Sequence, residues 1–163
     1  MKIEIGSGEY PRLIEEGYIH SDIRYPLPHQ ELCFDLRYLP FVSNSLDSIA
    51  IIHCLEHLSW RLEVPPTLKE LYRVLKPNGD LFIIAPNLLY VAKLIIEYED
   101  NIMEKYHDIM QDIYCIQDFS DNFHKSGFTP NMLYNLMKNA GFRDIVITEH
   151  TKIACAVHIR GWK

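Results

Sequence analysis

The first residues whose types and spacing could do chemistry are His53, Glu56 and His57, in the segment HCLEH. The order H-x-x-E-H is the inverzincin pattern, in which two histidines on one helical face hold zinc and the glutamate acts as a base. That interpretation needs a helix, a further ligand and a substrate cleft. Here the apolar run SIAII leads straight into His53, as a strand would, and a match of five residues arises easily by chance. We therefore expect no metal, and a zinc hydrolase is a remote alternative.

Two histidines are candidates for proton transfer. His57 closes HCLEH, and His124 lies in NFHKSGF, shortly before a segment that predicts a helix. Histidine titrates near neutral pH, so either imidazole could take a proton from an oxygen nucleophile. The alternative for each is a structural or surface histidine.

A glycine turn follows the first apolar run in MKIEIGSGEYP. Gly6 and Gly8 allow the backbone to turn tightly and a ligand to approach closely. A dinucleotide-binding turn has a third glycine and leads into a helix that holds pyrophosphate. Here that third position is Pro11, and Glu9 adds a negative charge beside the loop. The turn therefore favours a ligand that has a ribose but no phosphate.

Two carboxylates follow at the ends of the next two apolar runs. Asp22, in HSDIR, lies at the end of the second predicted strand, where a carboxylate can accept hydrogen bonds from both ribose hydroxyls. Asp35, in CFDLRYLPF, could accept one from an adenine amino group beside that ribose. Capping of a strand end is the structural alternative for both residues.

A sheet is needed to position these residues. The central apolar runs are hydrophobic at consecutive positions, which is typical of a parallel sheet covered on both faces. Helices are indicated where apolar residues recur at steps of three and four. The predicted strands are 2–5, 18–21, 32–34, 48–52, 80–85, 144–148 and 152–159, and the predicted helices are 66–76, 88–117 and 130–140.

Two connections are too short to contain crossover helices. About nine residues separate Gly8 from the second strand, and Pro26 and Pro28 interrupt the next connection. Both missing helices would cover the same face of the sheet. We expect the 88–117 helix or a second subunit to cover it, with irregular coil as the alternative, and we therefore predict a homodimer.

Composition limits the class of protein. The 163 residues suit one domain, and the net charge of −6 disfavours a broad nucleic-acid or anionic-membrane surface. Cys33, Cys54, Cys115 and Cys155 form no CxxC pair, so we expect free thiols in a reducing compartment. The longest apolar stretch, 88–96, is too short to span a bilayer, and no signal peptide opens the chain. These features predict a cytoplasmic protein.

Several segments together resemble the class I S-adenosylmethionine-dependent methyltransferases. The resemblance is greatest to a small group of predicted methyltransferases from bacteria and their relatives. They are EIGSG, HSDIR, DLRYLPFVSNSLDSI, CLEHL, LKELYRVLKPNGDLFIIAPN and NFHKSGFTPNMLYNLMKNAGF. The resemblance implies a single α/β domain over 1–163 with a helical insertion at about 88–118. Its Rossmann-like sheet would be mostly parallel, with an antiparallel last strand, and trimmed of the early crossover helices.

The resemblance also implies S-adenosylmethionine as the cofactor and assigns residues to it. The glycine turn matches the loop around the methionine part, the HSDIR carboxylate matches the ribose contact, and the segment after the fourth strand closes over the reactive methyl. The implied cofactor-binding residues are Glu4, Gly6, Ser7, Gly8, Asp22, Ile23, Asp35, Leu36, His53, Cys54 and Leu55.

The sequence therefore predicts transfer of a methyl group to a small molecule or sugar, with an oxygen acceptor favoured. The insertion at 88–125 and the loop after Leu55 would build the acceptor pocket. The long helical stretch could instead be a dimer contact, a lid or core. A non-catalytic relative that binds the cofactor or a partner protein is the main alternative.

Overall fold

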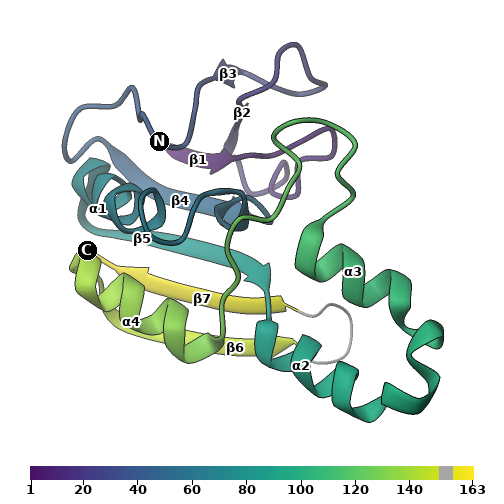
Figure 1. Ribbon diagram of the computed structural model, residues 1–163. Coiled ribbons are helices and arrows are strands. Elements are labelled where there is room, and N and C mark those ends of the chain that lie inside the picture. Colours follow the sequence, from purple (N-terminus) through teal and green to yellow (C-terminus); the bar gives the residue numbers. More distant parts are fainter. Residues whose placement is uncertain (151–155) are drawn as a thin grey trace.

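The computed structural model describes residues 1–150 and 156–163. Seven strands form one sheet in the order β3-β2-β1-β4-β5-β7-β6 (Figure 1). All neighbouring strands pair in parallel except β7, which runs antiparallel to β5 and β6. The predicted Rossmann-like sheet with an antiparallel last strand is confirmed. The strands are β1 (Lys2–Ile5), β2 (Ile19–Asp22), β3 (Leu32–Cys33), β4 (Leu46–Ile52), β5 (Leu75–Pro86), β6 (Arg143–His150) and β7 (Ala156–Trp162).

Every predicted strand has a counterpart in the structure. The strand predicted at 152–159 is described from Ala156 onward, and its first residues lie outside the described part of the chain. The central strands are buried at consecutive positions, as the continuous apolar runs predict.

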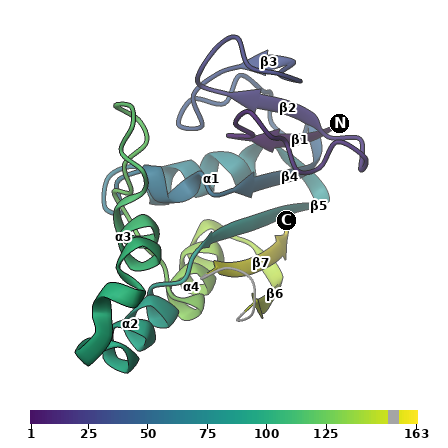
Figure 2. The same ribbon diagram turned by 90° about the vertical axis from the view of Figure 1, so that its right-hand side faces the viewer.

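Helices α1 (Val64–Val74) and α4 (Pro130–Ala140) lie side by side on one face of the sheet (Figures 1 and 2). Prolines occupy the first turn of both helices, where the missing N–H is not needed. Thr129 caps α4 by accepting a hydrogen bond from the backbone N–H of Met132, and Gly141 ends it in the left-handed conformation. Both helices confirm the sequence prediction.

The single helix predicted over 88–117 is wrong. The chain forms α2 (Leu88–Glu97), a 3-10 segment η2 (Glu99–Glu104) and α3 (Tyr106–Tyr114), with a kink at Asn101, where φ is −133°. Acidic residues at the carboxyl end of α2 oppose the helix dipole, and Asn competes for backbone hydrogen bonds. The apolar spacing continues across the break because α2 and α3 pack on each other around Val91, Leu94 and Ile109.

This α2–α3 hairpin does not cover the sheet face that lacks crossover helices, so the first of the two coverings we expected is wrong. The hairpin extends beyond the carboxyl end of β5 (Figure 1). Part of the face is covered instead by coil between β1 and β2: Leu13 packs against Ile52, Ile84 and Ala156, and the Tyr18 hydroxyl lies 2.7 Å from Ser48 Oγ. Within the described residues, no helix has both the length and the hydropathy to cross a membrane.

Candidate cofactor and active site

The sheet reverses its direction of growth at β1, which lies between β2 and β4. In open α/β sheets, ligands bind outside the carboxyl ends of the strands at such a reversal. A cavity of about 220 Å³ lies at this point. Its walls come from the ends of β1 to β4, from η1 (Leu55–His57) and from the segment after α3. The lining residues are Ile5, Gly6, Gly8, Asp22, Ile23, Arg24, Phe34, Asp35, Leu36, Arg37, His53, Cys54, His57, Leu58, Phe119, Asp121, Asn122 and Lys125.

The glycine turn forms one wall of this cavity. Gly6 has a φ of +71°, and a Cβ there would lie 2.4 Å from Cys54 Sγ. Gly8 has a φ of +64°, but a Cβ there would make only ordinary contact with Arg24 Nη2 at 3.7 Å, and its N–H donates to Asp22 Oδ2 at 3.0 Å. Position 6 therefore needs glycine for both backbone conformation and close packing, whereas position 8 needs it for conformation alone.

Asp22 is the better placed of the two predicted carboxylates. Its side chain is only 7% exposed, and Oδ1 accepts hydrogen bonds from the backbone N–H and Nε of Arg24 at 2.9 and 3.2 Å. Oδ2 accepts one bond, from Gly8, which leaves it one free acceptor position. Asp22 can therefore accept one ribose hydroxyl without any rearrangement of Arg24, rather than the two that the sequence suggested.

Asp35 also lines the cavity, but Arg37 already engages both of its oxygens. The Arg37 backbone N–H and side-chain Nε bond to Asp35 Oδ1, and Nη2 bonds to Oδ2 at 2.6 Å. These bonds hold the pKa of the Asp35 carboxyl below its usual range. Arg37 reaches Glu63 as well, through Nη1 at 2.7 Å. An adenine amino group would have to compete with Arg37 for this carboxylate.

Three of the predicted cofactor residues lie behind the cavity wall rather than in it. The Glu4 carboxylate accepts hydrogen bonds from the backbone N–H groups of Arg12 and Leu13. Ser7 Oγ donates to the Ser21 carbonyl at 3.2 Å, and Leu55 belongs to the buried core. These side chains support the turn and η1, and do not line the cavity.

The HCLEH segment enters the cavity through His53, Cys54 and His57. Burial raises the pKa of the Cys54 thiol, which keeps it protonated and apolar in behaviour. Only residues 55–57 are helical, as one 3-10 turn, and His53 precedes it with a φ of +51°. The two histidines therefore do not share the α-helical face that the inverzincin pattern requires.

The two base candidates are placed differently. His57 lines the cavity and donates its Nδ1–H to the Phe123 carbonyl at 3.1 Å, while burial lowers its pKa and favours the neutral ring. His124 lies behind it, with a side chain only 8% exposed and its Nδ1 2.9 Å from the Asp112 carbonyl. The ring centroids are 5.0 Å apart. Only His57 can reach a molecule in the cavity directly.

Sequence reasoning missed the two arginines, and from the segment after α3, which it assigned to the acceptor pocket, it named only His124. The Arg24 guanidinium lies 4.9 Å from the Phe119 ring, which brings that segment over the glycine turn. The backbone N–H groups of Lys125 and Ser126 both donate to the Glu56 carbonyl, at 2.8 and 3.0 Å. The sequence did contain a signal for the arginines. Arg24 and Arg37 each follow an aspartate by two residues, and an arginine at that spacing can fold back onto a strand-end carboxylate.

Comparison with known proteins agrees with this architecture. The methyltransferase domain family matches residues 16–83. The ubiquinone/menaquinone biosynthesis C-methyltransferase UbiE of Vibrio cholerae is 30% identical over 131 residues, which are 77% of this chain and 48% of that protein. The biotin biosynthesis protein BioHC of Saccharophagus degradans is 30% identical over 83 residues, which are 47% of this chain and 14% of that protein. The chain thus spans less than half the length of these curated relatives.

Solved structures share the fold at low sequence identity. A methyltransferase from Thermotoga maritima has a TM-score of 0.68 at 21% identity, covering 99% of this chain and 81% of the other. One from Archaeoglobus fulgidus has a TM-score of 0.69 at 18% identity, covering 99% and 85%. The sheet order and its switch-point cavity define a class of nucleoside-binding α/β domains. Residues 16–83 match the methyltransferase domain family, and the chain as a whole has the fold of these S-adenosylmethionine-dependent methyltransferases, which agrees with the resemblance seen in the sequence.

Proposed function

We propose that this chain transfers the methyl group of S-adenosylmethionine to an oxygen atom of a small molecule or sugar. The observation that carries the proposal is the cavity at the sheet's switch point, with the glycine turn on one side and Asp22 on another. The donor set suits this cofactor, since the site has backbone, carboxylate and apolar groups and no helix N-terminus of the phosphate-binding kind after the turn.

Bound in this cavity, S-adenosylmethionine would supply an electrophilic methyl group on a sulfonium. Gly6 and Gly8 would let the backbone approach its amino-acid part, and Asp22 would orient the ribose. Leu36 and Leu58, which line the cavity, would exclude water from the remainder. Alignment of this kind is the main contribution of an enzyme to a displacement and is worth roughly 7–11 kcal/mol.

The test of cofactor binding is calorimetric titration with S-adenosylmethionine and its demethylated product. We expect Asp22→Ala to weaken both about tenfold or more, since a hydrogen bond to a charged group is worth roughly 1.5–3 kcal/mol. Asp100→Ala, an exposed aspartate in η2, is the matched control. Unchanged affinity in a folded Asp22→Ala protein would remove the proposed ribose contact.

A glycine pair tests the shape of the cavity. Gly6 and Gly17 share a φ of +71°, but a Cβ at Gly17 meets nothing within 4 Å. Gly17→Ala should therefore report backbone strain alone, about 1–2 kcal/mol of stability, with cofactor binding retained. Gly6→Ala adds the collision with Cys54 and should abolish binding. Equal behaviour of the two variants would show that the turn does not bound the ligand site.

The acceptor atom is tested by product analysis. An oxygen acceptor must lose a proton, and His57 is the base candidate that reaches the cavity, with His124 behind it. His57→Gln should lower kcat with little change in cofactor affinity. The relationship to UbiE, a C-methyltransferase, makes a carbon acceptor the second candidate. A methylated carbon in the product would overturn the oxygen proposal and leave methyl transfer intact.

The homodimer is a proposal as well, supported by the sheet face without helices. Coil covers part of that face as far as Ile84 and Ala156, so the remaining candidate surface is the outer part near β6, where Val146 is 56% exposed. Light scattering at high concentration should give twice the chain mass, and Val146→Glu should lower it. A monomer in the unmodified protein would contradict the dimer.

The cytoplasmic location stays a prediction. It is supported by Cys33, Cys54 and Cys115, which are unpaired thiols in the described part of the chain. A fluorescent fusion in living cells would test it.

A further inference from the structure

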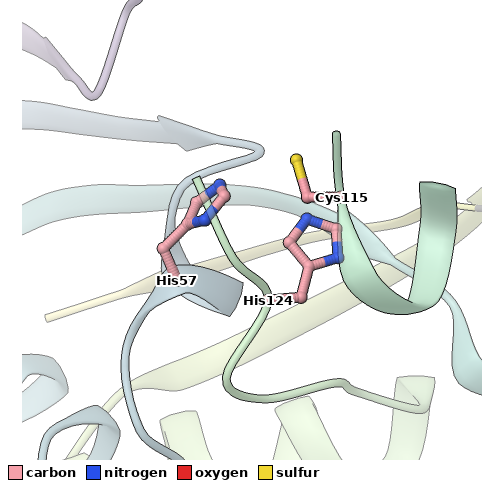
Figure 3. Close-up of side chains that lie close together, drawn as sticks. All are labelled: His57, Cys115 and His124. Carbon is pink, nitrogen blue, oxygen red and sulfur yellow. The ribbon is translucent and has the colours of Figure 1, made fainter. Parts of the chain in front are cut away.

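A second group of side chains borders the cavity, and the proposed methyl transfer does not account for it. His57 comes from η1, Cys115 from the carboxyl end of α3, and His124 from the segment that returns toward α4 (Figure 3). One nitrogen of each imidazole and the Cys115 sulfur lie within 4.8 Å of one another. Segments up to 67 positions apart thus bring together three atoms that all bind transition metals.

Both imidazoles are already oriented as metal ligands are. A carbonyl oxygen can only accept a hydrogen bond, so Nδ1 of His57 donates to Phe123 and Nδ1 of His124 donates to Asp112. In the neutral ring, that tautomer leaves Nε2 with a lone pair available. Metal-binding histidines characteristically donate their second N–H to a backbone carbonyl or carboxylate in this way.

An independent observation places an unpartnered carboxyl group behind this cluster. The Glu56 side chain is fully buried, and neither carboxylate oxygen has a hydrogen-bond partner in the described residues. The nearest imidazole nitrogens are His53 Nδ1 at 3.5 Å and His124 Nε2 at 3.9 Å. A buried carboxylate without partners is costly, and a cation close by would offset much of that cost.

We infer that His57, Cys115 and His124 bind a divalent zinc-class metal ion at the edge of the cofactor cavity. One sulfur and two imidazole nitrogens suit zinc or cobalt and not magnesium or calcium, which take oxygen ligands. Tetrahedral zinc with these bond lengths sets its ligand atoms about 3.3–3.8 Å apart, so the three side chains need to close by about 1 Å. Of the three ligands, His57 lines the cavity, so the metal would lie at the edge of the cavity.

This inference revises two sequence-based expectations. We expected no metal, and the remote zinc alternative used His53 with His57. The structure instead pairs His57 with two residues that no local motif connects to it. The inference is independent of the methyl-transfer proposal but conflicts with its base candidate, because with the metal bound Nε2 of His57 is a ligand and cannot take a proton from the acceptor.

The test is a cobalt titration of the full chain after treatment with a chelator. We expect one Co²⁺ per chain, with the thiolate-to-metal absorption that marks sulfur ligation, and displacement of Co²⁺ by Zn²⁺. Cys115→Ser should remove that absorption, and His124→Ala should weaken binding at least about tenfold. Cys33→Ser and His107→Ala, which change exposed residues of the same types, should behave like the unmodified protein.

Two results would overturn the inference: no Co²⁺ or Zn²⁺ binding by folded protein, or unchanged binding and absorption in Cys115→Ser. Denaturation of each apo variant shows whether it folds, and Zn²⁺ should raise the unfolding midpoint of the unmodified protein but not of Cys115→Ser. Titration of the chelator-treated protein with S-adenosylmethionine separates the two proposals. Cofactor binding without metal binding removes only the metal site, and metal binding without cofactor binding removes only the methyltransferase proposal.

Discussion

The two faces of the sheet are stabilised in different ways. On one face, α1 and α4 pack over an apolar layer, and the register aligns Ile5, Ile51, Ile83 and Ile159 across four strands. On the other face, the same register aligns residues that are mostly polar or small. These include Lys2, Glu4, Ser48, Ala50, Asp80, Phe82, His158 and Arg160.

The difference follows from the short connections around β2. Without crossover helices, the second face cannot bury a broad apolar layer, and a doubly wound sheet would aggregate if it kept one exposed. The chain solves this with specific polar contacts from coil, as between Glu4 and the backbone of Arg12 and Leu13. Hydrophobic area stabilises one face, and individual hydrogen bonds stabilise the other.

The largest effect is expected on the helix-covered face. Leu71 is fully buried in α1, and Leu71→Ala should lower the free energy of unfolding by about 2–5 kcal/mol, through lost transfer energy and the cavity left behind. Urea denaturation measures this. Leu62→Ala, at a leucine that is 75% exposed, is the control and should change stability by less than about 0.5 kcal/mol. A small effect at Leu71 would mean that the helix layer is not the main source of stability.

A smaller effect is expected at the centre of the helix-free face. Glu4→Gln replaces a buried carboxylate that accepts three hydrogen bonds from two backbone N–H groups and lies 3.1 Å from His20 Nδ1. Bonds to a charged group are worth roughly 1.5–3 kcal/mol, and the amide oxygen keeps part of that. Denaturation of Glu4→Gln should therefore show a loss of about 1–2 kcal/mol.

Exposed Glu15→Gln is the control for that change. If Glu4→Gln were as damaging as Leu71→Ala, single polar contacts would be stabilising the second face as strongly as helix packing stabilises the first. That result would sharpen the proposed contrast. A loss near zero would break it, because the coil would then be held by Leu13 and its apolar neighbours.

The same contrast explains what the sequence could predict. The strands and the helix-covered face can be predicted from local patterns, because a continuous apolar run or a capped amphipathic helix is recognisable within about a dozen residues. The absence of the crossover helices could also be predicted, from Pro26, Pro28 and the short connection after Gly8. The coil that replaces those helices could not be predicted, because its position depends on which backbone groups the Glu4 side chain contacts.

The residues of the candidate site likewise differ in how well the sequence could predict their positions. Gly6, Gly8 and Asp22 line the cavity where their positions at strand ends place them, because a parallel sheet brings those ends together. The Arg37 contacts to Asp35 depend on how a long side chain folds back, and no periodicity encodes that. The cluster of His57 with Cys115 joins separate segments, and the continuous helical spacing over 88–117 gave no indication of the kink at Asn101.

The smallest effect is expected at the outer end of the helix-free face. Arg160 lies 4.9 Å from the Phe82 ring centre and 3.5 Å from Asp80, with a side chain that is 46% exposed. Solvent screens such a pair, so Arg160→Ala should cost about 0.5–1 kcal/mol, and high salt should reduce the difference. Denaturation at low and high ionic strength measures both. A loss above about 2 kcal/mol that grows with protein concentration would mean that a second copy covers Arg160, because burial in a dimer interface removes the solvent screening. The face would then be helix-free only within one chain.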